Sequence, residues 1–215
     1  MQVTGFGATG RTGRFLVKEL IDNNYSIKAL VRSGEKLESK DRVIEIIQGD
    51  ILDYNSVKES ITGSEAVLSV IGHIKNTQKD MQKLGITNVI KAMNEDRITR
   101  LIVLTGAGVP SKKDKPTFAD KFTTFMVKTL AKDRFEDGVK YVEEIKKSNL
   151  NWTVVRANLL TNELNHVPYK VGYLGNKGLG YRISRKNVAK FMVKLLRDNS
   201  YSNEMPYISD RGILL

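Results

Sequence analysis

Glycines crowd the start of the chain, MQVTGFGATGRTG, at spacings that suit phosphate binding. Gly5, Gly7 and Gly10 fit the pattern G-x-G-x-x-G, whereas Gly7, Gly10 and Gly13 fit G-x-x-G-x-x-G. Glycine has no side chain to hold a phosphate away from backbone amides, and a helix that begins behind such a turn points further amides and a positive dipole at the anion. The two registers end the preceding strand at different residues, so the neighbouring elements must decide between them.

The register that begins at Gly7 leaves room for a full strand. If Gly5 came first, the strand would be too short to pair well inside a sheet. With Gly7 first, the strand covers Gln2–Phe6. We then expect Gly7 to permit a tight turn, Gly10 to let amides approach a pyrophosphate, and Gly13 to allow close packing of helix on strand. We interpret this segment as a dinucleotide-binding loop.

The end of the second expected strand, KALVRSGEK, bears on which dinucleotide is bound. Where a unit specific for NAD usually carries an acidic residue for the ribose hydroxyls, this chain has Arg32. An arginine fork matches a 2′-phosphate, and Ser33 adds a hydrogen bond, so NADPH is favoured, with NADH or an ordinary exposed arginine as the alternatives. After the third strand, Ile51 is expected beside the adenine, with Asp50 at its edge or capping the turn.

Short β-rich runs alternate with helical patterns along the chain. The expected strands are Gln2–Phe6, Ile27–Arg32, Val43–Gln48, Ala66–Ile71, Arg100–Thr105 and Trp152–Arg156. The expected helices include one starting near Arg11 and three later ones at Asp120–Lys132, Val139–Ser148 and Asn187–Leu196. This alternation predicts the α/β class: a single-domain Rossmann fold over 1–215, with a doubly wound parallel sheet and helices on both faces. Ligands bind at the carboxyl ends of such strands, where 106–118 and 161–182 are expected to form a small substrate-side region.

Composition excludes several classes of protein. The 215 residues, 40% of them hydrophobic, can form one sizeable core. No apolar run is long enough to span a membrane and no signal peptide is evident, so we expect a cytoplasmic location and no membrane partner. The chain has no cysteine and only two histidines, which argues against a disulfide scaffold or a metal site.

The net charge of +11 is concentrated unevenly. Eight basic residues and no acidic ones lie between Leu164 and Arg197. The simplest interpretation is a solvated surface, since lysine and arginine are ordinary surface residues. An anion-collecting rim over a ligand pocket is the alternative. Nucleic-acid binding is disfavoured because no recognition motif accompanies the charge.

Seven segments resemble, in order, those of the atypical short-chain dehydrogenases/reductases: GATGRTG, ALVRS, QGDILD, TNVIKAM, LIVLTGAG, SNLNWTVVRANLLT and ISRKNVA. The chain is most similar to the NAD(P)H-binding, NmrA-like branch of the biliverdin-IXβ reductase and flavin reductase type. The resemblance covers nearly the whole chain. It implies an NADPH-dependent reductase that transfers hydride to a flavin, quinone or tetrapyrrole-like acceptor. The alternative that it implies is a non-catalytic NAD(P)-binding redox sensor acting through a protein partner.

The Tyr-x-x-x-Lys pair of the short-chain dehydrogenases has no well-placed match. Tyr141 lies near the expected place, but its fourth successor is Ile145. The resemblance makes Lys140 the best candidate for holding the ribose. Gly106 and Gly138 stand where the biliverdin-reductase pattern has serine and histidine, which argues against biliverdin itself as the acceptor.

Hydride transfer to a flavin or quinone requires mainly that the nicotinamide stacks on the acceptor, and solvent can then supply the proton. Reduction of a carbonyl instead needs a positioned acid. We therefore predict hydride transfer without a dedicated acid, to a small-molecule acceptor, in a monomer or homodimer. The candidate catalytic residues are Thr105, Lys140 and His73, of which His73 lines the pocket or is merely a surface residue. The expected cofactor contacts are Gly7, Ala8, Thr9, Gly10, Arg11, Thr12, Gly13, Arg32, Ser33, Asp50, Ile51, Gly72, Thr105, Gly106, Lys140 and Arg156.

Overall fold

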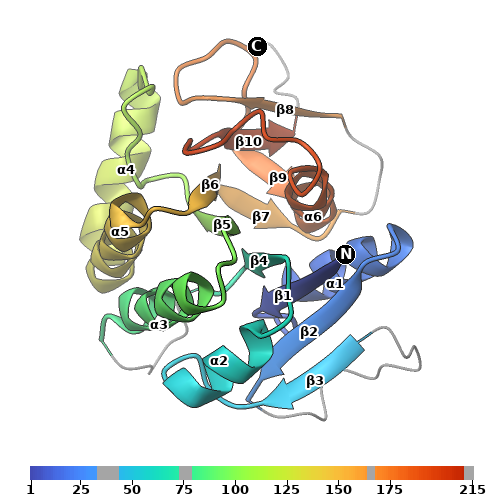
Figure 1. The fold of residues 1–215 in the computed structure, drawn as a ribbon. Coiled ribbons are helices and arrows are strands. Elements are labelled where there is room, and N and C mark those ends of the chain that lie inside the picture. Colours follow the sequence, from blue (N-terminus) through green and yellow to red (C-terminus); the bar gives the residue numbers. More distant parts are fainter. Residues whose placement is uncertain (33–43, 73–78, 164–167, 211–215) are drawn as a thin grey trace.

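The computed structural model describes residues 1–32, 44–72, 79–163 and 168–210 (Figure 1). Its strands are β1 Gln2–Phe6, β2 Ser26–Val31, β3 Ile44–Gln48, β4 Ala66–Ser69, β5 Arg100–Gly106, β6 Asn151–Ala157, β7 Leu159–Thr161, β8 Tyr169–Gly172, β9 Arg182–Ser184 and β10 Tyr207–Asp210. Its helices are α1 Gly13–Asp22, α2 Tyr54–Ile61, α3 Met81–Glu95, α4 Phe118–Leu130, α5 Lys132–Lys147 and α6 Arg185–Lys194.

Eight strands form one sheet in the order β3-β2-β1-β4-β5-β6-β10-β8. The pairs from β3 to β10 are parallel, and β8 joins the edge antiparallel to β10. The chain goes from β1 outward to β2 and β3, then crosses back so that β4 pairs with the other side of β1. This reversal is the topological switch point, where doubly wound sheets bind their ligands. The predicted Rossmann fold is confirmed.

Apolar residues on both faces of the sheet explain why helices cover it on both sides (Figure 1). One core packs α1 and α6 against the sheet through residues such as Leu16 and Val188. The other packs α2, α3 and α5, with Val57 and Val142 among its buried members. The central strands are therefore held from both sides, and their carboxyl ends keep a fixed arrangement.

The six predicted strands are present, and β1 has the predicted bounds. The last three predicted helices are also present, with shifted ends: α4 begins at Phe118, α5 begins seven residues before Val139, and α6 begins at Arg185. The sequence predicted no strand within 161–182, but this segment contains β8 and reaches β9. The prediction also missed β10, whose four residues insert beside β6. These strands are too short for a periodic signal, and tertiary pairing stabilises them.

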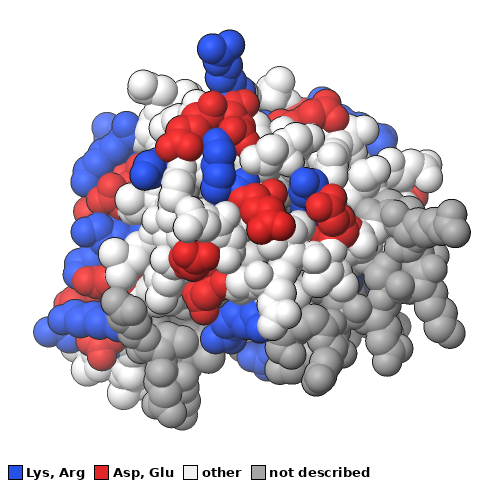
Figure 2. All heavy atoms as spheres, turned by 60° about the horizontal axis from the view of Figure 1, so that its bottom comes forward, with Lys and Arg blue, Asp and Glu red and all other residues white. Residues whose placement is uncertain are grey.

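On one face of the molecule, basic side chains do not gather into a single patch. In Figure 2, basic and acidic side chains are interspersed over the face that is drawn. That arrangement differs from the clustered basic face of a nucleic-acid-binding domain. Within the described ranges, no helix combines the length and hydrophobicity that crossing a membrane requires.

Candidate functional site

The glycine loop connects β1 to α1 in the register that begins at Gly7. Gly7 has φ +83°, a backbone conformation that favours glycine, and a Cβ there would lie 3.1 Å from the backbone nitrogen of Ile71 after β4. A Cβ on Gly13 would lie 2.6 Å from the carbonyl oxygen of Ala8 and closer still to that of Gly7. Gly10 donates its N–H to the carbonyl of Gly7 at 3.0 Å. The turn is therefore tight, and only glycine fits at its two ends.

The N-terminus of α1 is left open for an anion. Thr12, its N-cap residue, makes no side-chain capping bond, and the first turn contains no acidic residue. By contrast, α2, α4 and α6 are capped by Asp53, Thr117 and Ser184. The free amides of a helix N-terminus are an anion-binding site, and a loop of small residues lets a phosphate reach them.

An arginine of this loop, Arg11, interacts electrostatically with Arg185 of α6. Arg11 is exposed on the loop, while Arg185, the first residue of α6, is 6% exposed and donates to Asn162 at 2.7 Å. The Nε of Arg185 has no partner among the described residues. Burial, together with the charge of Arg11, lowers the pKa of Arg185. The charges of Arg11 and Arg185 therefore both contribute to a positive field near the glycine loop. Sequence reasoning missed Arg185, although basic residues in a first helical turn without acidic ones were a visible signal.

On the adenosine side of the expected cofactor site, Arg32 is exposed directly after β2. Asp50 follows β3, and its carboxylate accepts the N–H of Leu52 at 2.9 Å, which shapes the turn. Ile51 is half-buried, and a Cβ on Gly85 of α3 would lie 3.0 Å from its side chain. These positions follow β2 and β3 at the carboxyl edge of the sheet. Ser33, expected at the 2′-phosphate, lies outside the described residues.

On the other side of the glycine loop, Thr105 and Gly106 end β5. Thr105 is half-buried, Gly106 is exposed, and nothing lies within 4 Å of a Cβ built on Gly106. On α5, a Cβ on Gly138 would lie 3.8 Å from the hydroxyl of Thr105. Tyr141 is 2% exposed beside Ser69, and burial raises its pKa well above the usual value. The site therefore has open space at the end of β5, and Tyr141 is buried in the core.

Lys140 is tied to α3 rather than free. Its ammonium group donates to Asp80 at 2.8 Å, and this bond lowers the pKa of Asp80. Beside it, the buried carboxylate of Asp137 accepts the N–H groups of Gln82 and Lys83, and so caps α3 from a neighbouring helix. These contacts fix α5 against α3 at the sheet edge. To reach a ribose, Lys140 would have to leave Asp80 or bind it together with the ligand.

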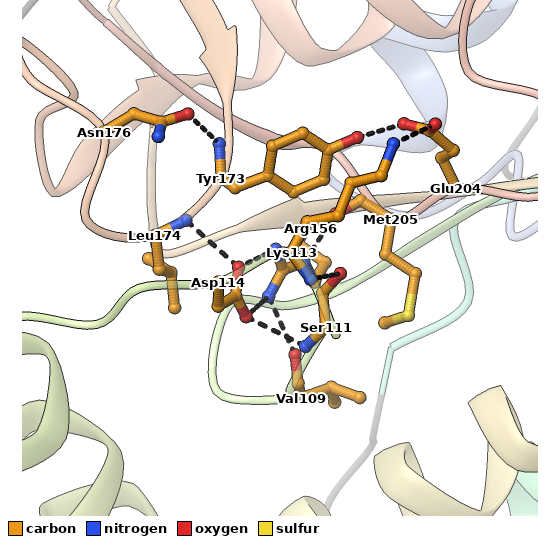
Figure 3. Close-up of polar contacts among 10 residues, drawn as sticks. All are labelled: Val109, Ser111, Lys113, Asp114, Arg156, Tyr173, Leu174, Asn176, Glu204 and Met205. Atoms are coloured by element: carbon orange, nitrogen blue, oxygen red, sulfur yellow. Dashed lines mark hydrogen bonds and ion pairs between the residues drawn. The ribbon is translucent and has the colours of Figure 1, made fainter.

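Arg156 was expected to contact the cofactor, but its side chain is fully buried and forms an internal ion pair (Figure 3). Its guanidinium donates to both carboxylate oxygens of Asp114, at 2.7 and 2.6 Å, and to the carbonyls of Val109 and Met205. Asp114 also accepts the N–H of Leu174 at 3.1 Å. No part of this guanidinium faces solvent, so we assign Arg156 a positioning role instead.

The same network joins the two segments expected on the substrate side. The N–H of Lys115 donates to the carbonyl of Leu174 at 2.8 Å. Glu204, on the loop before β10, accepts from Lys113 and from the hydroxyl of Tyr173 (Figure 3). The segments around 109–117 and 173–176 therefore lie against each other. A shallow hollow beside them is lined by Ala107, Gly108, Asp120, Thr123, Thr124, Val127, Asn158 and Leu174.

Of the remaining candidates, Ala8, Thr9 and Thr12 lie in the glycine loop, and Gly72 is exposed after β4. His73 lies outside the described residues. In the ranges that the structure does describe, no group of His, Cys, Asp or Glu side chains is arranged to hold a metal ion.

Several known proteins are similar to this chain. Cinnamoyl-CoA reductase 1 of Petunia hybrida is 26% identical over 129 residues, which are 54% of this chain and 39% of that protein. The chain spans less than two thirds of the first curated relatives that it matches.

Two solved structures share the fold. A short-chain dehydrogenase/reductase of Veillonella parvula in complex with NADP has a TM-score of 0.80 at 19% identity, over 98% of this chain and 95% of that one. ChuY, an anaerobillin reductase of Escherichia coli O157:H7, has a TM-score of 0.79 at 14% identity, over 100% of both chains. The model of the NAD(P)H-binding family matches residues 7–199, from the glycine loop to the end of α6 and beyond. The chain belongs to the NAD(P)H-binding family.

Proposed function

We propose that the protein is an NADPH-dependent reductase that transfers hydride to a flavin, a quinone or a tetrapyrrole-like acceptor. The observation that carries this proposal is the composition of the site at the end of β5. Gly106 has open space around it, Gly138 on α5 lies near Thr105 and has no side chain, and Tyr141, near the place expected for a catalytic tyrosine, is buried. That place therefore offers no accessible tyrosine to protonate an alkoxide. Conjugated acceptors do not need one, because the nicotinamide supplies the hydride and solvent supplies the proton.

The dinucleotide would bind across the switch point, with its pyrophosphate at the glycine loop. The uncapped N-terminus of α1 and the paired arginines, Arg11 and Arg185, support an anion at this place. The adenosine would lie toward Asp50 and Ile51, with its 2′-phosphate at Arg32 and Ser33. The fold shared with an NADP complex agrees with this placement. We therefore propose NADPH as the preferred cofactor, with NADH as the weaker alternative.

The acceptor would lie over the nicotinamide, between Thr105, Gly106 and the segments held together by Asp114. Thr105 would hydrogen-bond the acceptor or the nicotinamide, and Lys140 would contact the ribose if it leaves Asp80. The shared fold with an anaerobillin reductase supports a tetrapyrrole-like compound as one member of the acceptor class. His73 stays a candidate for the pocket wall.

The test is steady-state NADPH oxidation with FMN, riboflavin, menadione and a linear tetrapyrrole, alongside fluorescence titration of NADPH. We expect turnover with at least one acceptor. The Gly106→Leu variant should raise the acceptor KM more than about tenfold, which corresponds to roughly 1.4 kcal/mol of lost binding. Its NADPH affinity should stay near that of the wild type, because the leucine side chain extends into open space.

Gly106→Ala is the matched control, since its single methyl group should leave the acceptor KM almost unchanged. Tight NADPH binding without turnover of any acceptor in the panel would refute the proposed reductase activity and would favour a non-catalytic dinucleotide sensor. An unchanged KM in Gly106→Leu would instead show that the acceptor binds elsewhere.

A further inference from the structure

Helix α4 carries its large apolar side chains on the outside, whereas three of its polar residues are buried or half-buried. Asp120 is buried and Thr123 and Thr124 are half-buried, whereas Phe118 is 87% exposed and Leu130 is 75% exposed. A helix on the surface of a globular domain normally has the opposite arrangement, with apolar residues toward the core. The fold therefore leaves the apolar face of α4 uncovered.

The exposed apolar residues form one continuous stripe. They recur every three or four positions, so they share one face of the helix, and they are Phe118, Phe122, Phe125, Met126 and Leu130. Phe122 and Phe125, in the middle, are 58% and 61% exposed. The helix packs against α5 and stands at the edge of the molecule (Figure 1). We call these five residues the α4 stripe. Contiguous exposed apolar patches of this kind mark interaction sites.

Positive charges surround the α4 stripe. Its exposed basic neighbours along the chain are Lys112, Lys115, Lys121, Lys128 and Arg134, whereas Lys113 and Lys132 form ion pairs with Glu204 and Glu136. The acids of this segment do not balance them. Asp114 is buried against Arg156, and Asp120 is buried in the capping box of α4. Asp133 is the one exposed acidic residue between positions 111 and 134. The stripe is thus an aromatic surface with a cationic border.

We propose that the α4 stripe binds the surface of an anionic lipid bilayer, with α4 lying in the plane of the interface. Aromatic and aliphatic side chains on one face, bordered by lysines, are the pattern of interfacial amphipathic helices. The phenylalanines enter the boundary between headgroups and acyl chains, and Lys121 and Lys128 contact the lipid phosphates.

A second copy of the chain fits the α4 stripe less well. In a symmetric dimer the same patch meets itself, so the cationic border of one copy would face that of the other. The chain as a whole carries +11 charges, which adds to this repulsion. An anionic bilayer offers the opposite charge. The sequence had suggested no membrane partner because it lacks a spanning segment, but a helix that lies on the surface needs none.

Vesicle co-sedimentation tests the proposal. The wild type should bind phosphatidylcholine vesicles that contain phosphatidylglycerol, bind pure phosphatidylcholine much less, and lose affinity as salt is raised. Phe122→Ser with Phe125→Ser should lower affinity more than about tenfold, because the exposed rings are the inserting groups. Lys121→Gln with Lys128→Gln should lower it about 30-fold, from roughly fivefold per lysine.

Matched controls separate the α4 stripe from general charge or hydrophobicity. Lys18→Gln with Lys147→Gln removes the same charge from α1 and from the far end of α5, where both lysines are exposed. Leu84→Ser removes an exposed apolar side chain from α3. Both controls should bind the vesicles as the wild type does, and circular dichroism should show that every variant is folded.

Three results would overturn the proposal. One is a wild type that does not bind the anionic vesicles at low salt. Another is binding that the α4 variants leave unchanged. The third is a wild type that light scattering shows to be a dimer and that Phe122→Ser with Phe125→Ser converts to a monomer, because the stripe would then be an interface between copies. None of these results depends on NADPH or on turnover. The membrane proposal is therefore tested independently of the proposed reductase activity.

Discussion

Removal of Asp114 should destabilise the protein more than its position on a loop suggests. The Asp114→Ala variant leaves the guanidinium of Arg156 buried without a counter-charge, since that side chain is 0% exposed. It removes two charge-assisted hydrogen bonds, at 2.7 and 2.6 Å, and the acceptor for the N–H groups of Ser111 and Leu174. Loss of one partner of a buried ion pair costs about 3–5 kcal/mol. For a domain of this size that corresponds to a fall in Tm of roughly 6–20 °C.

Thermal and guanidinium unfolding, followed by circular dichroism, measure this effect. Lys18→Ala is the control, because Lys18 forms an exposed pair with Asp22 that contributes less than about 1 kcal/mol. The double variant Asp114→Leu with Arg156→Met should recover much of the stability, since a buried ion pair can be replaced by apolar residues at little cost. The reasoning is refuted if Asp114→Ala unfolds within about 1 kcal/mol of the wild type.

The same variant tests the positioning role of Arg156. Asp114 connects the segments on the substrate side but touches none of the glycine loop. At a temperature where Asp114→Ala is still folded, the acceptor KM should therefore rise while NADPH affinity stays unchanged. If the folded variant loses NADPH binding, the result would instead support a role for Arg156 in the cofactor site.

Four further predictions follow from single residues. Gly13→Ala should abolish NADPH binding in a fluorescence titration, because its Cβ would overlap the carbonyl of Gly7; wild-type affinity would contradict the assignment of the loop. Arg32→Asp should lower the affinity for NADPH relative to that for NADH by about 10- to 150-fold, because it removes an interaction of roughly 1.5–3 kcal/mol. An unchanged ratio of the two affinities would show that Arg32 does not contact the 2′-phosphate. Arg185→Gln should weaken the binding of NADPH and should also weaken the inhibition of that binding by inorganic pyrophosphate. Lys194→Gln, at the other end of α6, should change neither. Hydrogen bonds from Lys113 and Tyr173 lower the pKa of Glu204 from 4.5. The stability that Glu204 contributes is therefore present above pH 4.5 and is lost as the pH falls through the lower pKa of the folded state. The Tm difference between the wild type and Glu204→Gln should disappear over the same pH range, and a difference that persists in acid would refute this prediction.

Periodicity in the sequence was enough to predict β1 to β6 of the sheet, but not β8 and β10. Each central strand is a run of β-branched and aliphatic residues, buried on both faces, and the helices between them repeat at helical spacing. The glycine register followed from the same logic, since only one choice left β1 long enough. The positions of Gly7, Gly10 and Gly13 at the switch point were therefore predictable from neighbouring residues alone.

The roles of charged residues were not predictable in this way, because each depends on a partner far away in the chain. Arg156 ends a strand beside the expected cofactor, and only the fold reveals Asp114, 42 residues earlier, as its partner. Asp137 caps α3 across 55 residues, and Lys140 reaches Asp80 across 60. The exposure of the apolar residues of α4 was not predictable for a related reason, since a hydrophobic pattern shows that a face is apolar but not whether that face packs on the core or lies in solvent.

The two halves of the proposed site are built from different interactions, and this difference determines which half can vary. The cofactor half consists of backbone geometry, where Gly7 and Gly13 tolerate no side chain. The acceptor half consists of loops joined by side-chain contacts through Asp114 and Glu204, next to positions such as Gly106 and Gly138 that have room for a side chain. A change at Gly106 or Gly138 can therefore reshape the acceptor space without moving an amide of the glycine loop. We therefore predict that acceptor specificity can change while binding of the dinucleotide is retained, and the paired titration and turnover measurements test this separation.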